Sequence, residues 1–211
     1  MECNKQARII YLLRHGSILT KSCERRYIGQ SDVPLSGEGV RQAHMLQAEF
    51  AGKGISAVFC SDLIRSIATA RIICAGLTDN LVIRADLREI SMGDWEGKTF
   101  NEIAQDYPEE YAERGNNISN YRIPGAESFE ECRSRMAAAF EDIIDSTAGD
   151  IIIVGHAGIN RVLLCHILGM PLANLFRIYQ DYGCINILAG SGGQYRVKLL
   201  NGTHGHESQR E

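Results

Sequence analysis

Two histidines and an arginine stand where apolar runs of this chain give way to polar sequence. Arg14 and His15 directly follow the run 9–13, and His156 follows the run 151–154 after one glycine. A neutral imidazole is a competent nucleophile near pH 7, and a guanidinium supplies fixed donors and positive charge for phosphate oxygens. The Arg14-His15 pair therefore predicts a site that holds and attacks a phosphoryl group.

Two further reactive residues follow other β-rich runs. Arg65 lies one turn beyond the run 57–60, and Glu89 follows the run 81–84. In an open α/β sheet, ligands bind at the carboxyl ends of the strands, so these residues are expected to share one site with His15 and His156. The alternatives are a solvated helix face for Arg65 and a helix cap for His156.

Glu89 is the candidate proton donor because the chain's only tryptophan, Trp95, lies nearby in sequence. An apolar wall favours the protonated form of a carboxyl group, which can then donate to a leaving alkoxide. Glu96 competes for this role, and a surface ion pair with Arg84 or Arg88 is the structural alternative for Glu89. Spacing alone leaves the choice open.

The positioning elements are predicted from runs that alternate between β-rich and helical patterns. We expect strands at Ile9–Leu13, Ala57–Cys60, Leu81–Arg84, Ile151–Val154, Ile185–Ala189 and Tyr195–Leu200, and helices at 37–50, 63–75, 128–146 and 157–168. Ser36 is expected to cap the first helix, and 190–193 to form a hairpin turn. The alternation predicts a three-layer α/β fold, with a doubly wound, mostly parallel sheet and helices on both faces.

The chain of 211 residues suits a single domain, 1–211. Its least regular stretch, about 97–125, predicts a short helical insertion that acts as a lid. From about residue 201 the sequence is polar, and we expect a frayed tail.

Composition limits the classes of partner. The formal net charge of −4 argues against nucleic-acid binding through a basic surface, so any positive potential must be local. Seven cysteines without a CxxC pair favour free thiols in a reducing cytoplasm. No signal peptide or membrane-spanning run is evident, so we expect a cytoplasmic protein without membrane contact.

Taken in order, the motifs resemble those of the histidine phosphatase superfamily, in the branch of cofactor-dependent phosphoglycerate mutase and its small phosphatase relatives. The resemblance covers nearly the whole chain and is carried by Leu13-Arg14-His15-Gly16, Pro34–Ala43, Ser61–Ala70, Leu87–Gly97, Pro124–Ser128 and Val154–Gly158. It implies a phosphoglycerate mutase-like fold.

The resemblance also implies the role of each residue. His15 would be the nucleophile that becomes phosphorylated, and Glu89 would be the proton donor and later the base for water. Arg14, Arg65 and His156 would surround the phosphoryl oxygens. The implied reaction needs no metal or other cofactor, because positioning and charge supply what a loose phosphoryl-transfer transition state requires.

Two other classes remain as alternatives. A non-catalytic regulator that binds a phosphorylated ligand would be expected to lack one of the site residues, and none is lost. A metallohydrolase built on His15, Glu89 and His156 lacks an HxH or HExxH pair, and the neighbouring arginines would repel a cation.

The loop after the motif Leu13-Arg14-His15-Gly16 departs from the family pattern. Family members commonly carry an asparagine there that contacts phosphate, whereas this chain reads Ser17-Ile18-Leu19-Thr20-Lys21. Either Lys21 or Ser17 substitutes for that asparagine, or the loop is rebuilt for another substrate.

The segment Arg26–Ser36 is similar to the corresponding loop of bacterial α-ribazole phosphatases. Its Tyr27, Gly29 and Gln30, together with Ala157, are candidate substrate-binding residues, with Tyr27 either stacking on a base or walling the pocket. The small phosphorylated metabolite expected first is therefore α-ribazole 5′-phosphate.

The compact insertion favours hydrolysis over the mutase reaction, because the mutases carry extra structure there that closes over a bisphosphate. Phosphoglycerate mutase activity is kept as the alternative. Related enzymes are often dimers, so a homodimer is an assembly that the resemblance implies.

Overall fold

The computed structural model describes residues 7–20 and 24–203, which form one six-stranded sheet with the order β3-β2-β4-β1-β5-β6. The strands are β1 (Arg8–Arg14), β2 (Ile55–Cys60), β3 (Leu81–Ile83), β4 (Asp150–Gly155), β5 (Ile185–Ser191) and β6 (Gln194–Gly202). Strands β1 to β4 pair in parallel, whereas β5 and β6 add an antiparallel edge. The predicted, mostly parallel sheet is confirmed.

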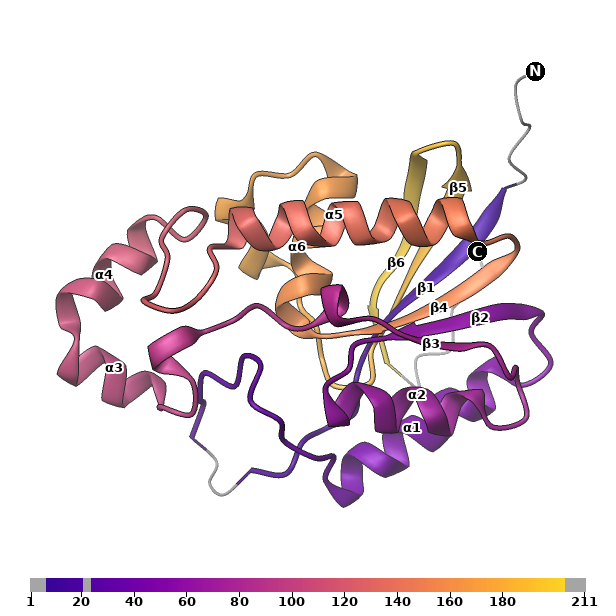
Figure 1. Ribbon diagram of the computed structural model, residues 1–211, viewed down its shortest axis with the longest axis horizontal. Coiled ribbons are helices and arrows are strands. Elements are labelled where there is room, and N and C mark those ends of the chain that lie inside the picture. Colours follow the sequence, from indigo (N-terminus) through magenta and orange to yellow (C-terminus); the bar gives the residue numbers. More distant parts are fainter. Residues whose placement is uncertain (1–6, 21–23, 204–211) are drawn as a thin grey trace.

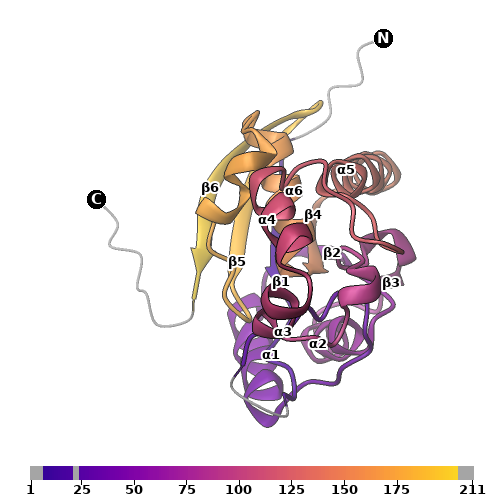
Figure 2. The same ribbon diagram turned by 90° about the vertical axis from the view of Figure 1, so that its left-hand side faces the viewer.

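Helices cover both faces of this sheet, as Figures 1 and 2 show. Helices α5 (Phe129–Ser146) and α6 (Ala157–Leu168) pack on one face, and α1 (Gly37–Phe50) and α2 (Ile64–Cys74) on the other. Strand β1 contributes to both cores because its side chains alternate: Ile10 and Leu12 face α5 and α6, and Tyr11 and Leu13 face α1 and α2. The three-layer α/β prediction is therefore correct.

The helical insertion predicted at about 97–125 is present as α3 (Phe100–Asp106) and α4 (Pro108–Asn116), which project beyond one end of the sheet (Figure 1). Its base packs on a small buried cluster of Tyr27, Trp95, Ile103, Ile123 and Ala126. Short 3-10 helices at Ala85–Leu87, Gly93–Trp95 and Leu172–Arg177 complete the connections. None of the helices in the described part of the chain is long and apolar enough to cross a membrane.

Local signals at two element ends are confirmed. The Ser36 side chain caps α1 by accepting a hydrogen bond of 3.1 Å from the Gly39 backbone N–H. The β5–β6 hairpin turns at Gly192 and Gly193, which have φ of 59° and 82° and so need glycine.

The prediction that a frayed tail begins at about residue 201 is wrong, because the last strand extends past that residue. Strand β6 continues to Gly202, and three hydrogen bonds hold Asn201. Its backbone N–H donates to Asn186 Oδ1 at 3.0 Å, its Nδ2 donates to Asp181 Oδ2 at 2.7 Å, and its Oδ1 accepts from the Asp181 N–H at 2.7 Å. The polar residue Asn201 is therefore part of the strand, because it hydrogen-bonds to Asn186 and Asp181. Residues 204–211 lie outside the described residues.

Candidate active site

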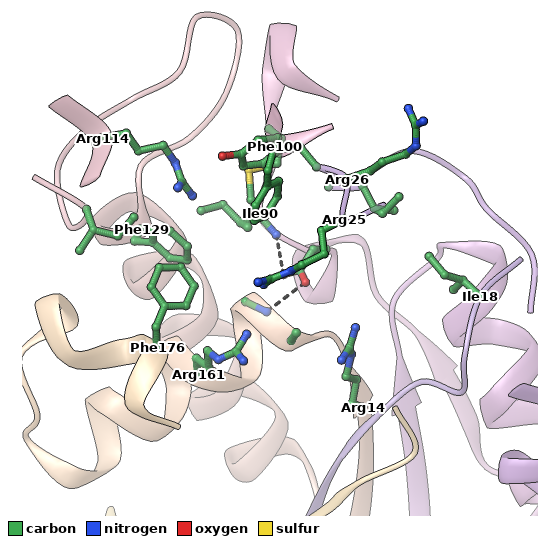
Figure 3. A pocket seen from close by; sticks show the side chains of 18 of the residues that line it. Arg14, Ile18, Arg25, Arg26, Ile90, Phe100, Arg114, Phe129, Arg161 and Phe176 are labelled. Carbon is green, nitrogen blue, oxygen red and sulfur yellow. Dashed lines mark hydrogen bonds between the residues drawn. The ribbon is translucent and has the colours of Figure 1, made fainter. Parts of the chain in front are cut away.

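A cavity of about 1010 Å³ opens between the carboxyl ends of the parallel strands and the helical insertion. Arg14, His15, Arg65 and Glu89 all line it. Three strand ends thus bring these four residues to one cavity, whereas His156, the fifth residue expected there, is not among the lining residues. Figure 3 shows the arginine side chains that converge on the cavity.

His15 lies at the end of β1, where its backbone N–H donates to the Gly155 carbonyl at 3.1 Å. Its Nδ1 lies 2.7 Å from the Gly16 carbonyl oxygen. Because a carbonyl only accepts, Nδ1 carries the ring proton and the neutral ring keeps an unprotonated Nε2. Burial, followed by the positive charges of Arg14 and Arg65, holds the pKa of His15 well below its ordinary value.

The packing of this turn requires a glycine at position 16. A Cβ atom on Gly16 would lie 2.3 Å from the Gly39 carbonyl oxygen, so the chain after His15 can approach α1 only because residue 16 is glycine. The Gly16 N–H also donates to Thr69 Oγ1 at 3.1 Å, which ties this turn to α2.

The two site arginines are held by backbone carbonyls. Arg65 is only 1% exposed, and its Nη1 and Nη2 donate to the carbonyls of Ser31 and Gly29, each at 2.7 Å. Arg14 donates to the Gln180 carbonyl at 2.6 Å. The Nε atoms of both arginines are buried and lack a partner among the described residues. Both cations are thus fixed in position while their charge remains unneutralised.

His156 precedes α6 and is fully buried, with its ring centroid 4.9 Å from that of His15. Its Nε2 is 2.7 Å from Ser61 Oγ, and its Nδ1 has no partner among the described residues. Burial, then the neighbouring His15 and Arg65, lowers the pKa of His156 well below its ordinary value. His156 occupies the N-cap position of α6, but its side chain makes no capping hydrogen bond.

Glu89 is held by the first turn of α6. Its Oε2 accepts from the Gly158 N–H at 3.0 Å, and its Oε1 accepts from the Ile159 N–H at 3.1 Å. The alternative of a surface ion pair for Glu89 is wrong. Arg84 forms salt bridges with Asp86 and Asp142, and Arg88 forms one with Asp62.

The expected Trp95 wall beside Glu89 is not found. Trp95 packs against Tyr27 and Tyr121, with ring centroids 5.2 and 6.4 Å away, in the cluster under the insertion. Glu96 does not line the cavity; it accepts from the Gln30 N–H at 2.8 Å and from the Ser31 hydroxyl at 2.9 Å. Of the two candidate acids, only Glu89 reaches the cavity.

The predicted substrate-binding residues divide into two groups. Tyr27, Gly29 and Ala157 line the cavity. Tyr27 stacks on Phe100 with ring centroids 4.2 Å apart, which favours a wall over a platform for a base.

Two other predicted residues lie behind the cavity lining. Gln30 donates through Nε2 to the Glu89 carbonyl at 3.0 Å, and the Ser17 N–H donates to Gln42 Oε1 at 2.8 Å. Ser17 is not among the lining residues, and Lys21 lies outside the described residues.

The cavity-lining side chains that sequence reasoning missed include Arg25, Arg114, Arg161 and Tyr182. The Tyr182 ring lies under the Arg14 guanidinium, with the Arg14 Cζ atom 3.7 Å from its centroid. Arg161 could have been found, because it lies four residues after Ala157 and so shares its face of α6. The other three come from segments whose approach depends on tertiary packing.

The charge of the cavity is strongly asymmetric. Six arginines and two glutamates line it, on a chain whose formal net charge is −4. Such a cavity attracts anions. Within residues 7–20 and 24–203, no three His, Cys, Asp or Glu side chains come together in a group that could hold a metal ion.

Comparison with known proteins gives the family. The model of the histidine phosphatase superfamily (branch 1) matches residues 10–203. A curated relative from Yersinia pestis (strain Pestoides F), "Probable phosphoglycerate mutase GpmB", is 34% identical over 163 residues, 77% of this chain and 75% of the relative.

Solved structures agree with this match. The alpha-ribazole phosphatase from Shigella flexneri superposes with a TM-score of 0.84 at 25% identity, covering 92% of this chain and 96% of that chain. Bacillus stearothermophilus YhfR superposes with a TM-score of 0.82 at 29% identity, covering 91% and 96% of the two chains. The fold and the family match are those of a phosphatase. The chain belongs to the histidine phosphatase superfamily, as its motifs predict.

Proposed function

We propose that this protein is a metal-independent phosphomonoesterase that acts through a phosphohistidine at His15 on a small phosphorylated metabolite. The observation that carries the proposal is the state of His15: a buried, neutral ring, with Nδ1 held by Gly16 and Nε2 free, between Arg14 and Arg65 on the wall of the cavity. A nucleophile of this kind is poised to attack a phosphoryl group whose charge the arginines balance.

The proposed reaction has two steps. His15 Nε2 attacks phosphorus while protonated Glu89 donates its proton to the leaving alkoxide. Ionised Glu89 then takes a proton from water, which attacks the phosphohistidine and releases inorganic phosphate. Hydrogen bonds from the N–H groups of Gly158 and Ile159 hold the Glu89 carboxyl group in place for both steps.

The positive groups balance the charge that builds on the transferring phosphoryl group. Arg14 and Arg65 are fixed by backbone carbonyls, so they need little reorganisation during the reaction. His156 is held by Ser61 next to His15, and its unpartnered Nδ1 is available to a phosphoryl oxygen once the ring proton resides there.

For the specific substrate we favour α-ribazole 5′-phosphate. Its support is the loop that carries Tyr27 and Gly29, the volume of the cavity, and the likeness to the Shigella flexneri alpha-ribazole phosphatase. The cytoplasm is the proposed compartment, supported by the free cysteines of the described residues.

Phosphoglycerate mutase activity is the second candidate, favoured by the 34% identity to the Yersinia pestis relative. Against it stands the compact insertion, with helices of 7 and 9 residues, which suits access of water to a phosphohistidine.

The test is phosphate release from a panel of phosphomonoesters in EDTA, with α-ribazole 5′-phosphate and 3-phosphoglycerate included and His15→Ala measured in parallel. We expect release that persists in EDTA, is fastest with α-ribazole 5′-phosphate and is lost in His15→Ala. Interconversion of phosphoglycerates without phosphate release would favour the mutase. No release from any ester by folded wild-type protein would favour a binding role.

A further inference from the structure

The cavity has a second positive region, formed by Arg114 of α4 and Arg161 of α6 with the rings of Phe129 and Phe176 (Figure 3). The Arg114 Cζ atom is 5.8 Å from the Phe129 ring centroid, and the Arg161 Cζ atom is 5.6 Å from the Phe176 centroid. The two rings meet edge to face with centroids 5.9 Å apart. Both guanidinium groups point into the cavity from this aromatic wall.

Neither of these arginines has an anionic partner within the described part of the chain. Arg114 contacts aromatic rings and makes no ion pair there, and Arg161 donates through Nε to the Ile178 carbonyl at 2.8 Å. By contrast, Arg88 pairs with Asp62, and Arg135 with Glu127.

Both cations are also partly buried. Burial lowers the pKa of both Arg114 and Arg161 below the ordinary arginine value. A partly buried cation without a counter-charge is unfavourable, and an incoming anion removes that penalty.

The carboxylates of the cavity are already engaged. Glu24 lies 3.6 Å from Arg26 in an ion pair, and Glu89 accepts from the N–H groups of α6. Neither carboxylate forms an ion pair with Arg114 or Arg161 among the described residues. An anionic ligand here would supply the ion-pair partner that both arginines lack among the described residues, adding for Arg161 to the electrostatic effect of Glu89.

Arg114 is the part of this region that is separate from the reacting end. The positive charges that act on His15 are Arg14 and Arg65, whereas Arg114 approaches Tyr27, Trp95 and Phe129. Arg161 is electrostatically coupled to the reacting end, since the charges of Arg14 and Glu89 act on it. A cavity of about 1010 Å³ is at the upper end of the range that holds drug-sized ligands, so a bare phosphate or a three-carbon ester would leave most of it empty.

We propose that Arg114 and Arg161 bind a second anionic group of the substrate, and that Phe129 and Phe176 pack against the apolar part joining it to the phosphate ester. This inference rests on the proposed phosphatase function at His15 but not on α-ribazole 5′-phosphate as the substrate, because that molecule carries one anionic group; a strong preference for a second anion would count against it. The substrate class it names is a phosphomonoester that carries a carboxylate or a second phosphate at the far end of an apolar or ring-containing spacer.

The test measures binding of phosphonates that cannot be hydrolysed, by isothermal titration calorimetry on the full chain. One series is n-alkylphosphonates of increasing length, and the second carries a terminal carboxylate on the same chains. A third series, with a terminal phosphate, distinguishes the two kinds of anion. At the length that spans the cavity, we expect the doubly anionic ligand to bind about tenfold or more tightly than its alkyl match, as expected for a hydrogen bond to a charged group.

Variants assign the effect to the arginines. In Arg114→Gln, the doubly anionic ligand should bind less than about threefold more tightly than its alkyl match, and Arg114→Lys should restore part of this difference in affinity. Arg71→Gln is the control and should keep the full affinity advantage of the second anion, because Arg71 is an exposed arginine of α2 that does not line the cavity.

Equal binding of the alkyl and doubly anionic series at every length would overturn the second subsite and leave the phosphatase proposal intact. An unchanged advantage in folded Arg114→Gln would also overturn it. If Arg114→Gln fails to fold, the length series with wild-type protein decides the question. Failure of every phosphonate to bind would count against the function at His15 as well.

Discussion

Glu89 and Gly158 meet through a hydrogen bond of 3.0 Å from the Gly158 N–H to Oε2, in the first turn of α6. A Cβ atom at position 158 would lie 2.5 Å from Glu89 Oε1, so the carboxylate reaches this place only because residue 158 is glycine. Gly158 thus sets the position of the proposed acid although it takes no part in proton transfer.

Substitution Gly158→Ala is expected to displace Glu89 and lower kcat/KM by roughly 10- to 100-fold, the cost of misplacing a reacting group by about 1 Å. The free energy of unfolding should change little, because the gain of about 1 kcal/mol from alanine over glycine in a helix offsets the cost of moving Glu89 and Ile90 away from the new Cβ atom. Steady-state kinetics and chemical denaturation measure the two effects. Gly54→Ala is the control, because no heavy atom lies within 4 Å of its Cβ position. Unchanged kinetics in Gly158→Ala would contradict this view of Glu89.

Glu89→Gln and Glu96→Gln should separate the two candidate acids. Glu89→Gln is expected to lower kcat/KM for alkyl phosphates by about 10²- to 10⁴-fold, and for p-nitrophenyl phosphate by less, because that leaving group needs no proton. Glu96→Gln should mainly weaken the loop that it holds through Gln30 and Ser31, with a lower free energy of unfolding. A larger leaving-group effect in Glu96→Gln would reverse the assignment.

Stability should depend on pH through the two buried histidines. The pKa values of His15 and His156 are held well below the ordinary value near 6.5, so the unfolded chain takes up more protons as pH falls below about 6.5. The free energy of unfolding should therefore be highest above that pH and fall toward the folded-state pKa values, by up to about 1.4 kcal/mol per pH unit for each histidine.

Denaturation between pH 7.5 and 5 measures this slope. His15→Gln should flatten it, whereas the exposed His44→Gln should leave it unchanged. Equal slopes in wild type and His15→Gln would rule out a buried, neutral His15.

The strand-end rule explains why the central site could be predicted. His15, Arg65 and Glu89 follow separate parallel strands, and such strands all end at one edge of a sheet. The same rule could not find Arg114, which comes from the helical insertion, or Tyr182, which lies in the loop before β5. Their positions depend on how those segments pack, and periodicity carries no signal for that.

The Trp95 expectation failed because nearness in sequence is not nearness in space. Gly93 has a φ of 49° and packs so tightly on Pro124 that a Cβ atom would lie 2.1 Å from its carbonyl oxygen. This turn directs Trp95 into the cluster below the insertion, away from Glu89.

The most direct test of the account is to trap the phosphoryl enzyme. Glu89→Gln should still be phosphorylated by p-nitrophenyl phosphate in EDTA, and its phosphohistidine should accumulate because no base activates water. We predict one phosphoryl group per chain, stable in base, lost in acid and located by mass spectrometry on the peptide that contains His15, with no label in His15→Ala. Turnover without a protein-bound phosphoryl group at any quench time, or a label on another residue, would contradict the account.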